Sequence, residues 1–171
     1  MKKIFFYLFL VSLMSYFSYH LTIYYIPKTV YGVFHYKMEK NQNLQDNEIK
    51  HLDVPNHKSR DVVMPNPDFL YSVCFYDLSE GDLNLTGTMP DSTYWSVSFY
   101  KPNTINWYIK NDKEFNTNQL DIKLSLLNRK EENTLKSPEK NGLMIIRILV
   151  EKKDQKSLDY FKSLQKSIVI K

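Results

Sequence analysis

An uncharged apolar run from Ile4 to Ile26, directly behind Lys2 and Lys3, constrains this chain more than any other feature. At about 1.5 Å per residue, a helix over this run is roughly 34 Å long, which is enough to cross a bilayer. Because hydrocarbon offers no water to the backbone, a lone spanning segment has to be helical. The run therefore predicts a transmembrane helix. Four tyrosines in its second half suit the membrane interface: Tyr16, Tyr19, Tyr24 and Tyr25.

Three other kinds of amino-terminal segment begin in a similar way. A cleaved secretory signal has the same basic start, with an apolar region over about Ile4 to Met14, but the chain contains no alanine and lacks a typical small-residue cleavage site. A lipoprotein anchor needs a cysteine just after the run, whereas the only cysteine is Cys74. A pilin-like subunit carries a Glu shortly inside its helix, and this run has no acid. We predict an uncleaved signal anchor, with a cleaved signal as the alternative.

The positive-inside rule gives the predicted orientation. Lys2 and Lys3 precede the run, and Lys28, Lys37 and Lys40 follow it, so the count is nearly even. A short lysine-bearing tail is nevertheless the usual start of a signal anchor, and long following domains cross largely regardless of their charge. We expect a single-pass membrane protein with its carboxy-terminal domain outside the cytoplasm, in the inner membrane and periplasm if the source is bacterial.

Three segments follow from composition. Residues 1–40 form the anchor helix and its extension, in which Pro27 ends or kinks the first helix and a second stretch places Val30, Phe34 and Met38 on one face. Residues 41–60 are polar and read as a linker, and their two histidines, His51 and His57, are predicted to be solvated. Residues 61–171 are long enough to close one core.

The third segment alternates apolar and polar residues with a period of two, which is typical of half-buried strands. The alternation covers residues 82–89, 94–100, 105–109 and 120–126, and a nearly continuous apolar run from Leu143 to Val150 predicts a central strand. A helix beginning near Asp154 should bury Leu158, Phe161 and Leu164. The predicted fold is mainly β, an antiparallel β-sandwich-like domain with an N-terminal transmembrane helix and a short C-terminal helix.

Several classes of site are absent from the sequence. The formal net charge of +4 comes from scattered lysines without an arginine-rich stripe, so we expect no nucleic-acid partner. No cluster of Cys, His and carboxylates has metal-ligand spacing, and no phosphate-binding loop occurs, so we expect no metal and no cofactor. Cys74 lies in an apolar run and is predicted to be a buried strand residue rather than a nucleophile.

The densest segment, Val62 to Ser72, contains Pro65-Asn66-Pro67-Asp68 and Tyr71-Ser72, and Asp77-Leu78-Ser79-Glu80-Gly81 follows it. With these motifs the chain resembles the family called domain of unknown function 1254, in its short, membrane-anchored form. The resemblance continues through four further stretches: Tyr94–Tyr100, Asn103–Trp107, Lys136–Pro138 and Gly142–Leu143. It implies a β-sandwich-like fold without an assigned activity. The chain departs from the family at Met64, where Arg is common, and at Lys101 and Ile105, where acids are common.

The candidate ligand-binding residues come from these motifs. Asn66 and Asp68 can form Asx-type turns, and Asp68, with Tyr71 and Ser72 beside it, can also act as a polar anchor or an acid. Ser72 lies in no nucleophile elbow, and His57 is the only histidine that we expect to reach it. Tyr94, Asn103 and Asn106 complete the set, as parts of an aromatic and polar groove for a sugar or peptide.

Two functions remain from the sequence. The first is a membrane-anchored envelope protein of uncharacterised activity, most simply a binding or structural module that meets the membrane through its helix and an envelope component, a glycan or a protein through its β domain. The alternative is an envelope enzyme, perhaps a hydrolase, that uses Asp68 and its neighbours. The absence of a triad, a metal set and the family's arginine favours the binding module.

Overall fold

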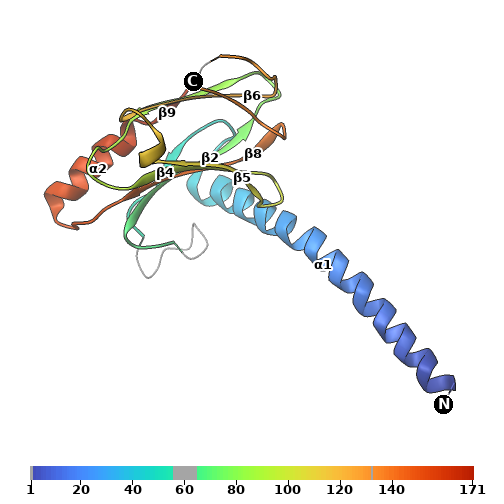
Figure 1. Cartoon of the computed structure of the whole chain (residues 1–171). Coiled ribbons are helices and arrows are strands. Elements are labelled where there is room, and N and C mark those ends of the chain that lie inside the picture. Colours follow the sequence, from blue (N-terminus) through green and yellow to red (C-terminus); the bar gives the residue numbers. More distant parts are fainter. Residues whose placement is uncertain (1, 56–64, 132) are drawn as a thin grey trace.

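A computed structural model describes residues 2–55, 65–131 and 133–171. The first element is a single helix, α1 (Lys2–Gln42), which projects from the β domain as a rod (Figure 1). It is long and apolar enough to span a membrane, and its apolar residues from Ile4 to Ile26 are exposed. The prediction that the helix ends at Pro27 is wrong, because the helix continues through this residue, and the alternative of a kink there stays a prediction. A proline removes one backbone bond, and nearby the Thr29 hydroxyl donates to the Tyr25 carbonyl (2.9 Å), a local bond of the kind that helps helices tolerate proline.

The carboxy-terminal end of α1 packs on the outer face of a β-sheet. Met38 is buried there against Val73 and Phe75, and the Phe34 ring lies 5.4 Å from that of Phe75. The predicted face is thus confirmed for Phe34 and Met38. Val30 stays 45% exposed, and Tyr31 packs on the sheet instead.

The β domain consists of two packed sheets. The first has the order β1-β2-β8-β4-β5 and the second the order β7-β6-β3-β9, and β6 and β7 form the one parallel pair among the described strands. The strands are β1 (Lys50–His51), β2 (Phe69–Asp77), β3 (Leu83–Thr88), β4 (Trp95–Tyr100), β5 (Asn106–Asn111), β6 (Gln119–Ser125), β7 (Thr134–Lys136), β8 (Asn141–Leu149) and β9 (Val169–Ile170). The predicted sandwich is therefore confirmed, and an additional edge strand, β1, lies within the segment interpreted as a linker.

The core fills the space between the sheets. Trp95, Val97 and Phe99 of β4 point into it, as their alternation predicted, and β8 lies between β2 and β4 as the expected central strand. A short 3₁₀ helix, η1 (Asp112–Glu114), follows β5 and is capped by the Asn111 side chain. The core thus separates the outer face of the first sheet, where α1 docks, from the second sheet.

Helix α2 (Gln155–Ser167) packs against β2 and β3 and covers one side of the sandwich. Asp154 caps it by accepting a hydrogen bond from the Ser157 N–H (3.0 Å), as the sequence predicted. Phe161 is buried, whereas Leu158 is only partly buried. Gln165 is also buried, because its amide donates to the carbonyls of Leu52 (3.2 Å) and Tyr71 (2.9 Å) and so joins α2 to the first sheet.

Cys74 is a buried strand residue, as predicted, and its thiol should be unreactive in the folded protein. It is fully enclosed between the sheets, and burial raises the pKa of the thiol well above its ordinary value of 9.0. The thiolate is the reactive form, so a maleimide at pH 7.5 should modify Cys74 only when the domain unfolds. Mass spectrometry should show one slow modification in buffer and rapid modification in urea. Rapid labelling with native circular dichroism would contradict this packing.

Candidate functional site

Four of the predicted site residues gather at one end of the first sheet. Phe69 at the start of β2 pairs with Leu149 at the end of β8, and Trp95 at the start of β4 pairs with Ile148. The antiparallel register therefore brings the segment before β2 and the residue before β4 to the same end. The predicted residues at this end are Asn66, Asp68, Tyr71 and Tyr94. We call it the Asp68 end.

Local hydrogen bonds fix the Asp68 end. The Asn66 side chain accepts from the Asp68 N–H (2.9 Å), which is the predicted Asx turn, and the Asn66 N–H donates to the Tyr71 hydroxyl (3.0 Å). The Asp68 carboxylate pairs with Lys153 Nζ at 2.7 Å, although its side chain remains 54% exposed. The Phe69 ring lies 6.1 Å from that of Tyr94, so an aromatic pair adjoins the charged pair. Such a surface can bind polar groups and stack on a flat ligand.

Asn103 and Asn106 lie at the opposite end of the sheet, beyond the last residue of β4. The Asn103 side chain accepts from the Ile105 N–H (3.3 Å), and the Asn106 amide donates to the Tyr108 carbonyl (3.4 Å). These bonds are typical of turn-forming asparagines. Because the strand between the two ends is roughly 20 Å long, the asparagines and Asp68 do not share one cleft. The ligand-binding roles of both groups stay predictions.

Ser72 faces the opposite side of β2 from Tyr71 and bonds to a histidine. The histidine is His51 of β1, whose Nδ1 lies 2.9 Å from Ser72 Oγ, so the expectation that only His57 could reach Ser72 is wrong. His57 itself lies outside the described residues. His51 is also half-buried rather than solvated, because β1 pairs with β2 and places the ring beside Ile168. Ser72 is only 1% exposed, which leaves no room for a substrate at its hydroxyl.

The half-buried imidazole of His51 should make the stability of the domain depend on pH. Burial is the main cause that lowers the pKa of His51 from its ordinary 6.5, with a bond to the Ile168 carbonyl opposing the shift and Lys166 adding to it. The unfolded chain then binds a proton more readily than the folded one below pH 6.5. Stability should be constant with respect to this group above pH 6.5 and should fall as the pH drops toward the lower folded-state pKa.

Urea unfolding at pH 7.5, 6.5 and 5.5 checks this dependence. The contribution of one histidine is at most about 1.4 kcal/mol per pH unit. His51→Gln should remove it, whereas Ser72→Ala should retain it, because burial rather than the serine causes the shift. An unchanged slope in His51→Gln would show that other groups cause the pH dependence.

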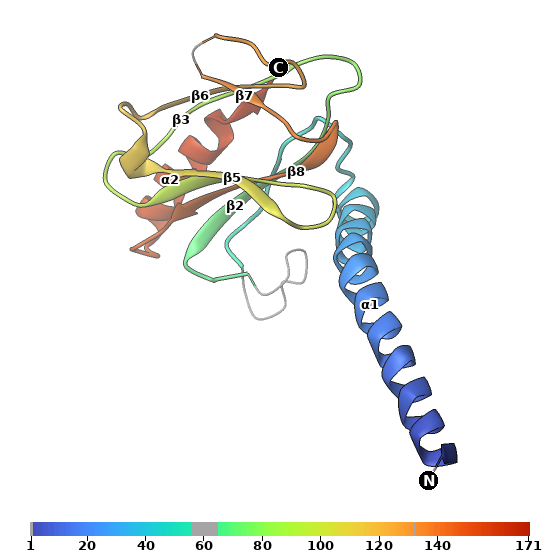
Figure 2. The same ribbon diagram turned by 45° about the vertical axis from the view of Figure 1, so that its right-hand side comes forward.

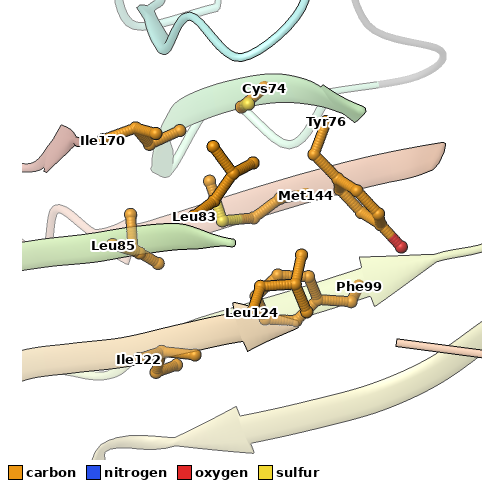
Figure 3. A pocket seen from close by; sticks show the side chains of 9 residues that line it. All are labelled: Cys74, Tyr76, Leu83, Leu85, Phe99, Ile122, Leu124, Met144 and Ile170. Atoms are coloured by element: carbon orange, nitrogen blue, oxygen red, sulfur yellow. The ribbon is translucent and has the colours of Figure 1, made fainter. Parts of the chain in front are cut away.

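A small cavity in the interior of the sandwich offers no ligand site. Figure 3 shows the nine side chains that line it, from both sheets, with the Tyr76 hydroxyl pointing away from the group. The cavity has a volume of about 10 Å³, which is at the limit for one water molecule, and its walls are apolar. The ring centres of Trp95 and Phe115 lie 4.7 Å apart, with Trp95 in the core and Phe115 packed against it, so these aromatic side chains are structural.

Metal ligands are also not grouped. In the ranges 2–55, 65–131 and 133–171, no three His, Cys, Asp or Glu side chains are placed to hold a metal ion. Sequence reasoning missed two residues of the polar sites, Lys153 and His51. Lys153 is far from Asp68 in sequence, and only the pairing of β2 with β8 brings them together. His51 lies in the two-residue strand β1, which is too short for its sequence to show an alternating pattern.

Comparison with known proteins places this domain in a family. The sequence profile of a protein of unknown function, DUF1254, matches residues 47–171. The chain belongs to the DUF1254 family. The match covers β1 as well as the motifs after residue 60, so the DUF1254 region begins inside the segment that composition marked as a linker. Met64, one of the departures from the family pattern, lies outside the described residues. No curated protein matches the chain.

Two solved structures share the DUF1254 fold of this chain. The VPA0106 protein from Vibrio parahaemolyticus superimposes with a TM-score of 0.66 at 11% identity, over 88% of this chain and 36% of that one. A putative uncharacterized protein from Burkholderia cenocepacia gives 0.52 at 17% identity, over 70% of this chain and 35% of that one. At these identities the likeness shows the fold alone. The chain spans about a third of the length of the solved structures that it matches.

Proposed function

We propose that this DUF1254 protein is a single-pass membrane protein that holds a small binding domain at the membrane surface, outside the cytoplasm. The observation that carries the proposal is that the two ends of α1 have different surroundings. Residues 4–26 expose their apolar side chains, whereas Met38, further along the same helix, is buried on the first sheet. A continuous helix that is apolar at one end and docked at the other supports a rigid tether.

The Asp68 end is the surface that we propose for a partner. It lies at the end of the first sheet opposite the β4–β5 connection, which faces α1 (Figures 1 and 2). A domain anchored through α1 would therefore present Asp68, Lys153 and the Phe69–Tyr94 pair away from the bilayer. Charges beside partly exposed aromatic rings suit a glycan or a polar peptide of the envelope. An enzyme would need a reactive group here, and the Asp68 carboxylate is already paired with Lys153 at the surface.

Extraction and topology experiments test the tether. The full chain should stay in the membrane pellet after alkaline carbonate treatment, and its intact mass should include residues 1–26. A reporter fused after Lys171 should be active only outside the cytoplasm. A mature chain that begins after Ile26 would identify the run as a cleaved signal, and an active cytoplasmic reporter would reverse the orientation.

Binding to envelope fractions tests the partner surface. Asp68→Ala and Tyr94→Ala in the full chain should weaken binding, because they remove the exposed charge and the partly exposed ring. Asp121→Ala, at an exposed position on β6 of the second sheet, serves as the matched control and should bind as the wild type does. Equal binding by all variants with unchanged circular dichroism would exclude the Asp68 end as the partner surface.

A further inference from the structure

The connection between β4 and β5 approaches α1 and leaves a groove between them. Figures 1 and 2 both show this hairpin beside the helix. The groove is about 1080 Å³ in volume, at the upper end of the range for small-molecule sites. One wall is α1 from Phe17 to Lys28, the other is Pro102–Ile105, and Glu139 also lines the groove.

The groove is lined mainly by apolar and aromatic side chains, with His20 among them, and by two charged residues, Lys28 and Glu139. Phe17 and Leu21 line it within the apolar run, and Ile105 of the hairpin is 54% exposed beside it. Lys28 stands just past the end of the run, with Nζ 3.6 Å from the centre of the Tyr24 ring. From Phe17 to Lys28 the helix rises about 16 Å, which is roughly half the thickness of a hydrocarbon core. The groove thus covers the depth of one leaflet, from the headgroups to the middle of the bilayer.

The exposed tip of the hairpin has a defined conformation. Thr104 has φ of 63°, in the left-handed region that β-branched residues rarely adopt, and the Lys101 N–H closes the turn by donating to the Ile105 carbonyl (2.9 Å). This turn presents Pro102 and Ile105 at the groove, and both backbone polar groups of Ile105 are paired within the turn. A tip that combines two apolar side chains with the polar Asn103 and Thr104 is suited to the membrane interface, where headgroups and water satisfy the remaining polar groups.

We propose that this groove holds one phospholipid of the surrounding bilayer, with a phosphoethanolamine headgroup. Lys28 attracts the phosphate, Glu139 attracts the ammonium, and one acyl chain lies along Phe17 and Leu21 against Ile105. A cation and a carboxylate on one groove match a headgroup that carries both charges and disfavour a purely anionic one. The proposal rests on the membrane tether proposed above, since α1 brings the groove to the bilayer.

The position of the hairpin tip is tested with a fluorophore in the full chain. Because Cys74 is buried, Ile105→Cys provides the one reactive thiol of the folded variant within the described residues. An environment-sensitive dye at this position should shift to the blue in vesicles and be quenched by nitroxide lipids. Leu127→Cys is the matched control, because Leu127 is 62% exposed on the loop after β6 and does not line the groove. The dye at position 127 should show the same emission maximum in vesicles as in detergent, and nitroxide lipids should not quench it.

The headgroup is tested by native mass spectrometry of the full chain from mixed vesicles. Phosphoethanolamine lipid should be retained about fivefold over phosphocholine and phosphoglycerol lipids, and Glu139→Gln should reduce this preference to parity. Lys28→Gln should lower retention of all three lipids. Glu151→Gln, an exposed change outside the groove, should leave the preference intact.

The outcomes separate this proposal from the tether. Carbonate-resistant protein whose dye at position 105 behaves like that at 127 would overturn the lipid groove and leave the tether standing. Retention of phosphoglycerol lipid instead, or a preference unchanged by Glu139→Gln, would overturn the assigned headgroup. Protein released by carbonate would overturn both.

Discussion

Replacing Gly142 with alanine should destabilise the β domain by about 3 kcal/mol or more, near the upper limit for overpacking a core. A Cβ on Gly142 would lie 2.4 Å from the Tyr100 carbonyl oxygen and 2.4 Å from the Tyr76 hydroxyl. Neither neighbour can give way easily. The Tyr100 oxygen belongs to the backbone of β4, and the Tyr76 hydroxyl is held by Trp107 (3.3 Å) and Ser137 (3.4 Å). Since β8 lies between β2 and β4, the methyl group must push two strand pairs apart.

Thermal and urea unfolding of the full chain in detergent measure this effect. A loss of about 3 kcal/mol should lower the melting temperature by roughly 10 °C for a domain of this size. Gly32→Ala is the matched control, because a Cβ there would meet nothing within 4 Å and alanine favours a helix. It should be neutral or slightly stabilising. If both variants unfold at the wild-type midpoint, Gly142 does not lie between Tyr76 and Tyr100.

Periodicity in the sequence predicted most of the sandwich, because alternation marks a strand with one face in a core. Alternation predicted β4, where the core residues are Trp95, Val97 and Phe99. The continuous apolar run of β8 predicted a central strand. Strands of two or three residues are too short to show a period, so β1, β7 and β9 had no signal. The buried Gln165 was missed for a related reason: its partners are backbone carbonyls of Leu52 and Tyr71, which no side-chain pattern reveals.

The candidate site was predicted only where its residues are neighbours in sequence. Asn66 and Asp68 are two residues apart, and their Asx turn follows from local chemistry. Lys153 was not predicted, and Tyr94 was predicted in one groove with Asn103 and Asn106. Lys153 and Tyr94 both lie near Asp68 because of the strand register, which a single sequence does not specify. The same limit explains His51, whose contact with Ser72 depends on an edge strand without a periodic pattern. Pairing between distant segments therefore accounts for most of the differences.

The docked end of α1 should contribute more to the stability of the β domain than any other removable segment of the chain. We compare a chain that begins at Lys28 with one that begins at Asn43. The first retains Tyr31, Phe34 and Met38 on the outer face of the first sheet, and the second exposes Val73 and Phe75 beneath them. Burial of an apolar side chain contributes about 1.5–3 kcal/mol, so the loss of these three should cost roughly 5 kcal/mol.

That loss is comparable to the whole stability of many domains, so the chain from Asn43 should be largely unfolded or aggregated. The chain from Lys28 should unfold cooperatively in urea. Within it, Met38→Ala should cost about 2–5 kcal/mol, because Met38 is 1% exposed against Val73 and Phe75. Val30→Ala, on the same helix at 45% exposure, should change the free energy of unfolding by no more than about 0.5 kcal/mol. Equal midpoints for the two truncated chains would mean that α1 only adjoins the domain. The predicted difference would instead make the helix end part of the fold, so that a domain held by α1 keeps a fixed face toward the membrane.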